Sequence, residues 1–232
     1  NNEALTNFQG WQLSGDVPTT KIISGFQKNV DQAAIEVADE LGMDIGGNVV
    51  KGVHRVPGGA DSPHFNQWKN RNIWKELEEA PNLAQAYRAR TIANIREADA
   101  TVAFYSAAEQ KTSKGYFLAR NEAQRVAKER GVPVEDIFIV IDPTEYQHQI
   151  SKFQTGLTAK QVNFKEWLTR NNVRTLNVAG PRPEKIGANA YSNRIGEAAK
   201  LFLKKTFAKR TAGKTRKTDI KQKGISDVNE LK

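Results

Sequence analysis

Segments that have the pattern of buried strands alternate along this chain with segments that have the pattern of amphipathic helices. The strand pattern is a short run of apolar residues, and 137–141 (IFIVI) is the most apolar run of this kind. The helix pattern repeats apolar residues every three to four positions, as Val30, Ala34, Val37 and Leu41 do. Such alternation predicts a parallel sheet with helices on both faces. The expected fold class is therefore α/β, a three-layer α/β/α Rossmann-like sandwich with a mostly parallel sheet.

The expected elements follow from these two periodicities. The principal strands are expected at 21–25, 100–105, 137–141 and 175–180. The helices are expected at 30–41, 82–96, 115–130, 159–169 and 191–207. Gly42 and Gly131 stand where two of these helices would stop, and helices commonly end at a glycine. The segment 46–62, which is rich in glycine and β-branched residues, predicts a short strand and a long loop.

Composition limits the class of protein. Hydrophobic residues make up 38% of the 232 residues, which is enough for a packed core. The absence of cysteine excludes a disulfide scaffold, a cysteine nucleophile and a thiolate metal site. No apolar run approaches the roughly 20 residues that span a bilayer, so we expect a cytoplasmic protein without membrane contact. We expect three parts: an N-terminal arm at 1–20, a Rossmann-like domain at 21–205 and a basic C-terminal tail at 206–232.

The formal net charge of +9 is concentrated near the C-terminus. The window 204–223 holds nine basic residues and one acidic residue, so the rest of the chain is nearly neutral. The nine are Lys204, Lys205, Lys209, Arg210, Lys214, Arg216, Lys217, Lys221 and Lys223. A segment of this composition cannot bury enough apolar surface to fold alone. It is either a solvated tail or an electrostatic contact with nucleic acid or another large anionic assembly.

Hydroxyl, glycine and cationic residues follow three of the expected strands. Ligands of parallel α/β sheets bind where strands end, and a turn that opens a helix favours an anion. The candidates in these turns are Ser24, Gly25, Phe26, Gln27 and Lys28, then Thr112, Ser113, Lys114 and Gly115, and finally Gly180 and Arg182. Arg90, Thr91 and Asn94 share one face of the helix that precedes the second strand. Each group alone could be a plain turn or a solvated polar stripe; together they predict a site for a small anionic ligand.

Several of these segments resemble the molybdenum cofactor carrier protein family. This family belongs to the SLOG group of Rossmann-like proteins, which also includes the lysine-decarboxylase-like phosphoribohydrolases. The most specific segments are 87–91 (YRART) and 176–182 (LNVAGPR), with support from 22–25, 30–34, 51–52, Asn94 and 98–101. The resemblance covers about 21–205. It implies a homo-oligomer that binds the molybdenum cofactor or a nucleotide at the strand ends, with Lys51 and Gly52 among the binding residues.

Departures from the family pattern bear on the expected activity. Phe26 stands where the family has a glycine, and a side chain there is expected to crowd a backbone that approaches phosphate. The Gly-Gly-x-Gly-Thr motif of the phosphoribohydrolases, with its following glutamate, is absent. We therefore favour a binding protein, with or without a degenerate pocket, over an enzyme. The alternatives are a structural protein that docks on nucleic acid or a large assembly through its tail and, with less support, a nucleotide-processing hydrolase.

Other catalytic chemistry has little support in the sequence. The three histidines, His54, His64 and His148, lack the spacing of metal ligands. Ser24 has no neighbouring base that would activate it as a nucleophile. Asp31 opens a helix, where a carboxylate commonly accepts hydrogen bonds from free N–H groups, so we interpret it as a cap. The sequence predicts no catalytic residue and no metal ligand.

Overall fold

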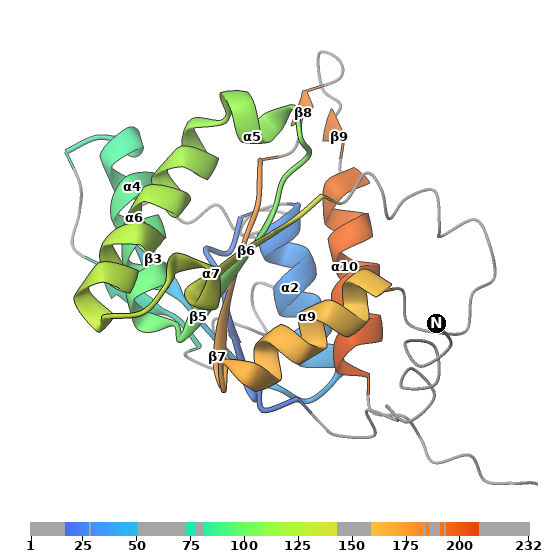
Figure 1. Cartoon of the computed structure of the whole chain (residues 1–232). Coiled ribbons are helices and arrows are strands. Elements are labelled where there is room, and N and C mark those ends of the chain that lie inside the picture. Colours follow the sequence, from blue (N-terminus) through green and yellow to red (C-terminus); the bar gives the residue numbers. More distant parts are fainter. Residues whose placement is uncertain are drawn as a thin grey trace, which may run out of the picture. The chain divides into compact units, whose positions relative to one another are not determined.

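The main sheet consists of five parallel strands in the spatial order β2-β1-β7-β5-β6 (Figure 1). The structure, a computed structural model, describes residues 17–27, 29–50, 73–77, 81–142, 159–182, 184–185, 191–192 and 194–208. The strands of the sheet are β1 (Lys21–Ile23), β2 (Asp44–Gly46), β5 (Ala100–Phe104), β6 (Phe138–Ile141) and β7 (Thr175–Ala179). In addition, β3 (Asn48–Val50) pairs in parallel with β4 (Lys75–Leu77), and β8 (Glu184–Lys185) pairs antiparallel with β9 (Tyr191–Ser192).

Helices cover both faces of the main sheet, so the molecule has the three layers that the alternation predicts (Figure 1). One layer holds α2 (Val30–Glu40), α9 (Ala159–Arg170) and α10 (Arg194–Phe207). The other holds α4 (Leu83–Glu97) and α6 (Lys114–Arg130). Two single-turn helices, α5 (Glu109–Thr112) and α7 (Val134–Ile137), lie just before α6 and β6 in the chain.

The apolar runs of the sequence form the centre of the sheet. Every residue of β5 is buried, because a central parallel strand is covered by helices on both faces. Phe104 at the end of β5 meets Phe202 of α10 edge to face, with ring centroids 5.7 Å apart. Phe164 of α9 packs on the same Phe202 ring at 5.5 Å. These aromatic contacts fix the C-terminal helices against the sheet.

The chain order places the topological switch point of the sheet at the last strand, β7. From β1 the chain moves outward to β2, and from β5 it moves outward in the opposite direction to β6. The last strand, β7, then enters between β1 and β5 and pairs with both of them. In open parallel sheets such a change of direction leaves a crevice at the carboxyl ends of the strands. The expected binding edge therefore lies where β1, β7 and β5 end.

The ends of the helices carry the signals that the sequence suggested. Gly131, the residue after α6, has a φ of 69°, a left-handed conformation that glycine adopts without strain. Gly42, just after α2, has a φ of 67°. The Ser113 side chain accepts a hydrogen bond from Tyr116 N at the start of α6. The Asn82 side chain accepts one from Gln85 N at the start of α4. Local capping therefore agrees with the helical periodicity.

The C-terminal part differs from the expected boundaries. Helix α10 begins at Arg194 rather than at Tyr191, because Tyr191–Ser192 forms β9. The helix continues to Phe207, and Thr206 and Phe207 are both buried. Core packing therefore extends beyond residue 205, where we placed the end of the domain. No helix within the described ranges is long and apolar enough to cross a membrane.

Candidate functional site

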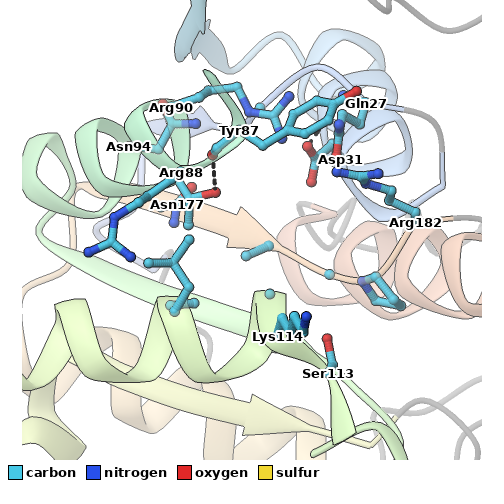
Figure 2. A pocket seen from close by; sticks show the side chains of 18 of the residues that line it. Gln27, Asp31, Tyr87, Arg88, Arg90, Asn94, Ser113, Lys114, Asn177 and Arg182 are labelled. Carbon is cyan, nitrogen blue, oxygen red and sulfur yellow. Dashed lines mark hydrogen bonds between the residues drawn. The ribbon is translucent and has the colours of Figure 1, made fainter. Parts of the chain in front are cut away.

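The carboxyl ends of β1, β7 and β5 border a cavity of about 500 Å³. Figure 2 shows that Arg90, Asn94 and Tyr87 of α4 lie on one side of it, and Ser113 and Lys114 at the start of α6 on the other. Ten of the predicted site residues line this cavity: Gly25, Gln27, Arg90, Thr91, Asn94, Ser113, Lys114, Gly115, Gly180 and Arg182. The three strand-to-helix turns and the polar face of α4 therefore meet at one place.

The turn after β1 is shaped by a serine inside the loop. Ser24 is fully buried, and its hydroxyl donates to the Asp31 carbonyl oxygen at 3.2 Å. The Ser24 Oγ also accepts a hydrogen bond from Phe26 N at 3.4 Å. Ser24 is not among the residues that line the cavity. Its part in the site is to hold the loop that presents Gly25 and Gln27.

Phe26 does not occupy the cavity, in contrast to the crowding that we expected. Its φ of 54° turns the residue into the left-handed region, which is uncommon for an aromatic side chain. The ring is 2% exposed and meets Trp74 edge to face, with centroids 5.3 Å apart. At this position, where the resemblance implied a glycine, the aromatic side chain therefore points into the core, and Phe26 is not among the residues that line the cavity.

The strongest electrostatic feature is a pair of buried, opposite charges. Asp31 on α2 is 8% exposed and Arg90 on α4 is 9% exposed. Burial raises the pKa of Asp31 to about 6, and the positive charge of Arg90 opposes this rise. Burial likewise lowers the pKa of Arg90, and Asp31 opposes that change. The Arg90 Nε is buried and has no hydrogen-bond partner. Buried polar groups are rarely left unpaired, so this donor is unusual among the described residues.

Gly25 lies between these two charges. A Cβ atom on Gly25 would stand 2.6 Å from Arg90 Nε and 2.7 Å from the Asp31 Oδ2. Both distances are shorter than real Cβ contacts, so any side chain here would displace one of the charged groups. The Asp31 carboxylate also accepts a hydrogen bond from Gln27 N at 3.3 Å. Glycine at this position therefore permits the close approach of Asp31 and Arg90 to the loop.

Tyr87 of α4 is enclosed by two guanidinium groups. The Arg182 Cζ lies 4.0 Å from the centre of the Tyr87 ring, and the Arg90 Cζ lies 5.2 Å from it. Both are cation–π distances, which hold a planar guanidinium at the cavity wall. The Tyr87 hydroxyl is a second buried polar atom without a hydrogen-bond partner. Arg182, which follows β7, is thus positioned by an aromatic ring on α4 rather than by its own loop alone.

The start of α6 forms the opposite wall. Ser113, Lys114 and Gly115 all line the cavity, and helix N-termini favour anions because their first N–H groups lack partners within the helix. A Cβ on Gly115 would stand 3.3 Å from the Tyr105 hydroxyl, so small size is useful here too. Burial, followed by the nearby Asp31 charge, raises the pKa of Tyr105. Tyr105 therefore stays protonated and can donate a hydrogen bond.

Other predicted residues lie elsewhere or have structural roles. Thr112 is exposed, donates to the Ala108 carbonyl oxygen and does not line the cavity. Asn94 lines the cavity, but its side-chain oxygen accepts from Asn48 N at 2.7 Å and from the Asn48 amide at 2.9 Å. It therefore also ties β3 to α4. The remaining predicted pocket residues lie outside the described residues: Lys28, Lys51 and Gly52.

The basic tail is described only at its start. Lys204 and Lys205 lie on α10, and the Lys204 ammonium forms a salt bridge with Glu40 of α2. Lys204 therefore contributes to helix packing. The other tail cations, together with the three histidines, lie outside the described residues: Lys209, Arg210, Lys214, Arg216, Lys217, Lys221, Lys223, His54, His64 and His148.

The sequence pattern missed several residues of the cavity wall. Asp31 has the position of a helix cap, yet its carboxylate faces the cavity and the loop N–H of Gln27 instead. Asn177 lies inside β7, where a polar side chain is unusual, and it lines the cavity while donating to Thr101 Oγ1 at 3.1 Å. A polar residue within an apolar strand pattern could have identified Asn177 as a candidate site residue from the sequence alone. Arg88 and Tyr105 carried no comparable signal.

The comparisons with known proteins agree with this fold. The model of the circularly permutated YpsA SLOG family matches residues 22–207, which is most of the chain. A solved structure from Syntrophus aciditrophicus SB, named as a molybdenum carrier protein, is similar with a TM-score of 0.57 and 22% identity. The similarity covers 84% of this chain and 99% of that chain, and it supports the fold. No curated protein matches the chain. The match over 22–207 shows that the chain belongs to the circularly permutated YpsA family of SLOG proteins.

Proposed function

We propose that this protein binds a small phosphorylated ligand of the nucleotide or pterin type in the cavity at the carboxyl ends of β1, β7 and β5. The observation that carries the proposal is Arg90, whose buried Nε has no hydrogen-bond partner. A buried donor without a partner destabilises a fold by about 1–3 kcal/mol, so a ligand that accepts from it gains affinity. The proposed function is binding.

The charge of the cavity supports an anionic ligand. Asp31 is the one carboxylate among the described residues that line the cavity. Four cationic side chains line it as well: Arg88, Arg90, Lys114 and Arg182. The N-terminus of α6 adds a partial positive charge beside Lys114. A phosphate at this wall would meet backbone N–H groups and a lysine together. The name of the similar Syntrophus aciditrophicus protein makes the molybdenum cofactor one candidate ligand.

Ligand binding by purified protein tests the proposal directly. The ligands are nucleoside monophosphates, cyclic nucleotides and phosphorylated pterins, and the readouts are thermal stabilisation and calorimetry. At least one class should stabilise the protein, because a ligand at 100 times its Kd adds about 2.7 kcal/mol. Arg90→Met should abolish the effect. Arg174→Met is the matched control, since Arg174 is exposed and lies next to the amino end of β7.

Two outcomes would contradict the proposal. One is that no ligand class binds at millimolar concentration; the other is that Arg90→Met binds as tightly as the unchanged protein. Arg90→Met also removes the positive charge beside the buried Asp31 carboxylate, so the free variant should be less stable than the unchanged protein. Thermal unfolding of the free variant shows whether it is folded before it is titrated. The double variant Asp31→Asn/Arg90→Met removes both charges, and it replaces Arg90→Met in the titrations where the single variant does not fold.

A further inference from the structure

Arg90 and Asp31 place a donor and an acceptor close together on the part of the cavity wall beside Gly25. Arg90 Nε and Asp31 Oδ2 lie 2.6 and 2.7 Å from the point where a Gly25 Cβ would be. Both side chains are more than nine-tenths buried, and both line the cavity. The interaction of these two described residues is electrostatic and includes no direct hydrogen bond between them. Each group therefore retains bonding capacity toward a ligand.

A purely anionic ligand would satisfy only half of this arrangement. A phosphate would pair with Arg90, but the Asp31 carboxylate beside it would repel the phosphate charge. The arrangement instead matches a ligand edge on which an acceptor and a donor stand side by side. Arginine supplies donors only, and an ionised carboxylate supplies acceptors only. The edge must therefore offer oxygen toward Arg90 and N–H groups toward Asp31.

We propose that Arg90 and Asp31 together bind the 2-amino-4-oxo edge of a guanine- or pterin-type ring. This edge, which the two ring systems share, presents a carbonyl oxygen, a ring N–H and an amino group in a row. Arg90 donates to the carbonyl oxygen, and Asp31 accepts from the ring N–H and the amino group. The inference rests on the proposed function of the cavity and specifies its ligand.

The remainder of the cavity suits the rest of such a ligand. Ser113 and Lys114 lie across the cavity from Arg90, on a different helix (Figure 2). A phosphate attached to the ring through a sugar or a short side chain would point toward this wall. Arg182, whose Cζ lies 4.0 Å from the centre of the Tyr87 ring, also lines the cavity, and its planar guanidinium can stack on a ligand ring. The cavity thus separates ring recognition from phosphate recognition.

The same two residues should weaken the binding of related rings that have a different edge. Adenine places an amino group where guanine has its carbonyl, so two donors would face each other at Arg90. Xanthine has a second carbonyl in place of the amino group, so an oxygen would face the Asp31 carboxylate. A well-placed bidentate contact discriminates between bases by roughly tenfold to a hundredfold. We expect preferences of that size here.

Asp31 also accepts from Gln27 N, so a purely structural role is the competing explanation. Asp31→Asn separates the two roles. An asparagine amide has the same shape, and its oxygen can still accept from Gln27 N, but its amide nitrogen donates where the carboxylate accepted. If Asp31 reads the ring, this variant loses affinity for guanine and gains affinity for xanthine. If Asp31 only holds the loop, all ligands lose affinity alike.

Calorimetric titrations of the full chain with guanosine, inosine, xanthosine and adenosine monophosphates provide the test. The pH is about 7.5, where a carboxyl with a pKa of about 6 is ionised. The unchanged protein should bind the guanosine compound about tenfold or more tightly than the xanthosine and adenosine compounds. Asp31→Asn should reverse the order of guanosine and xanthosine, and Arg174→Met should leave it unchanged. A second series, a phosphorylated pterin against the lumazine that carries the same side chain, shows whether the natural ring is a pterin.

The outcomes distinguish this inference from the proposed function. Equal affinity for all four nucleotides and for the pterin and lumazine pair would overturn the assignment of the ring edge and leave the proposed function standing. An equal loss of affinity for all four nucleotides in Asp31→Asn would also overturn the assignment of the ring edge and leave the proposed function standing. Absence of binding by every probe would overturn the proposed function itself. Thermal unfolding of each free variant confirms that it is folded before it is titrated.

Discussion

Asp31 shows how a buried carboxylate in the cavity wall can limit the stability of the fold. A carboxylate that is 8% exposed loses most of its hydration, and the hydrogen bond from Gln27 N replaces only part of it. The charge of Arg90 compensates further, yet the pKa of Asp31 is still raised to about 6. The free protein therefore holds a charge in its cavity wall that it would keep more easily in the unfolded chain.

The raised pKa of Asp31 predicts that the stability of the protein depends on pH. The ordinary pKa of 3.8 rises to about 6 on folding, so the folded state binds the Asp31 proton more tightly. The contribution of Asp31 thus becomes less favourable as the pH rises from about 4 to 6, and it stays unfavourable above that. At pH 7 Asp31→Asn should be more stable than the unchanged protein, by at most about 3 kcal/mol. Below a pH of about 4 the two proteins should have equal stability.

Urea denaturation of the two proteins between about pH 4 and 8 measures this difference. Comparison of the pair cancels the titration of other groups, such as Glu97, whose pKa is lowered by its contacts with Lys75 and Asn48 despite its partial burial. A stability difference that is constant across the range would show that Asp31 has its ordinary pKa in the folded state.

The sequence predicted the cavity better than it predicted the role of each residue in it. Turns after parallel strands converge by geometry, so Gly25, Ser113 and Arg182 could be brought together without a structure. The direction of a side chain within a turn depends on backbone angles that no local pattern encodes. Phe26 illustrates this, because its φ of 54° directs the ring toward Trp74 and away from the cavity.

At the scale of elements, the periodicities located the long helices and the apolar strands, and they located β2 poorly. This strand is Asp44–Gly46, and Ile45 is its only aliphatic residue, so no apolar run marks it. Local sequence patterns also could not predict the order of the strands in the sheet. The position of β7 between β1 and β5 depends on which faces pack together, a property of the whole sheet.

One asparagine joins three elements next to the cavity. Asn29, which precedes α2, accepts a hydrogen bond from Gly196 N of α10 at 2.6 Å and donates to the Pro181 carbonyl oxygen at 3.1 Å. A Cβ on Gly196 would stand 2.6 Å from the Asn29 side-chain oxygen, so the glycine permits this contact. The bonds fix the start of α2, the start of α10 and the turn after β7 relative to one another.

Substitutions of Asn29 should separate the contribution of these bonds from that of the backbone. Asn29 has a φ of 78°, which glycine adopts without strain and alanine does not. Asn29→Gly should lose about 1–3 kcal/mol, because the buried Gly196 N–H is left without its acceptor. Asn29→Ala should lose about 1 kcal/mol more through backbone strain. Denaturant unfolding gives both values, and equal losses in the two variants would show that the backbone angle carries no strain.

Asn29→Asp is the matched control for the hydrogen bond. An aspartate keeps the acceptor for Gly196 N and places a negative charge beside the first turn of α10, where such a charge is favourable. This variant should retain most of the stability, although it loses the bond to Pro181. A loss as large as that of Asn29→Gly would show that the Pro181 bond, and not the Gly196 bond, holds the elements together.

At the scale of the whole molecule, the charge is divided between a nearly neutral domain and a basic C-terminal segment. Lys204 belongs to the domain, because its ammonium is paired with Glu40. Beyond Ala208 the chain still carries seven basic residues before position 224 and one acidic residue, Asp219, among them. We predict that this segment binds phosphates independently of the cavity.

Salt-dependent binding to nucleic acid tests this function of the segment. A chain that neutralises seven phosphates of duplex DNA releases counterions, so the logarithm of its affinity should fall with the logarithm of salt concentration with a slope of about −6 at most. A chain that ends at Ala208 should lose this binding and keep its affinity for the cavity ligand, because α10 ends at Phe207. Replacement of the seven basic residues by glutamine in the full-length chain is the control for length: Lys209, Arg210, Lys214, Arg216, Lys217, Lys221 and Lys223. Nucleic-acid binding that survives both changes would place the contact on the domain and leave the segment as a solvated tail.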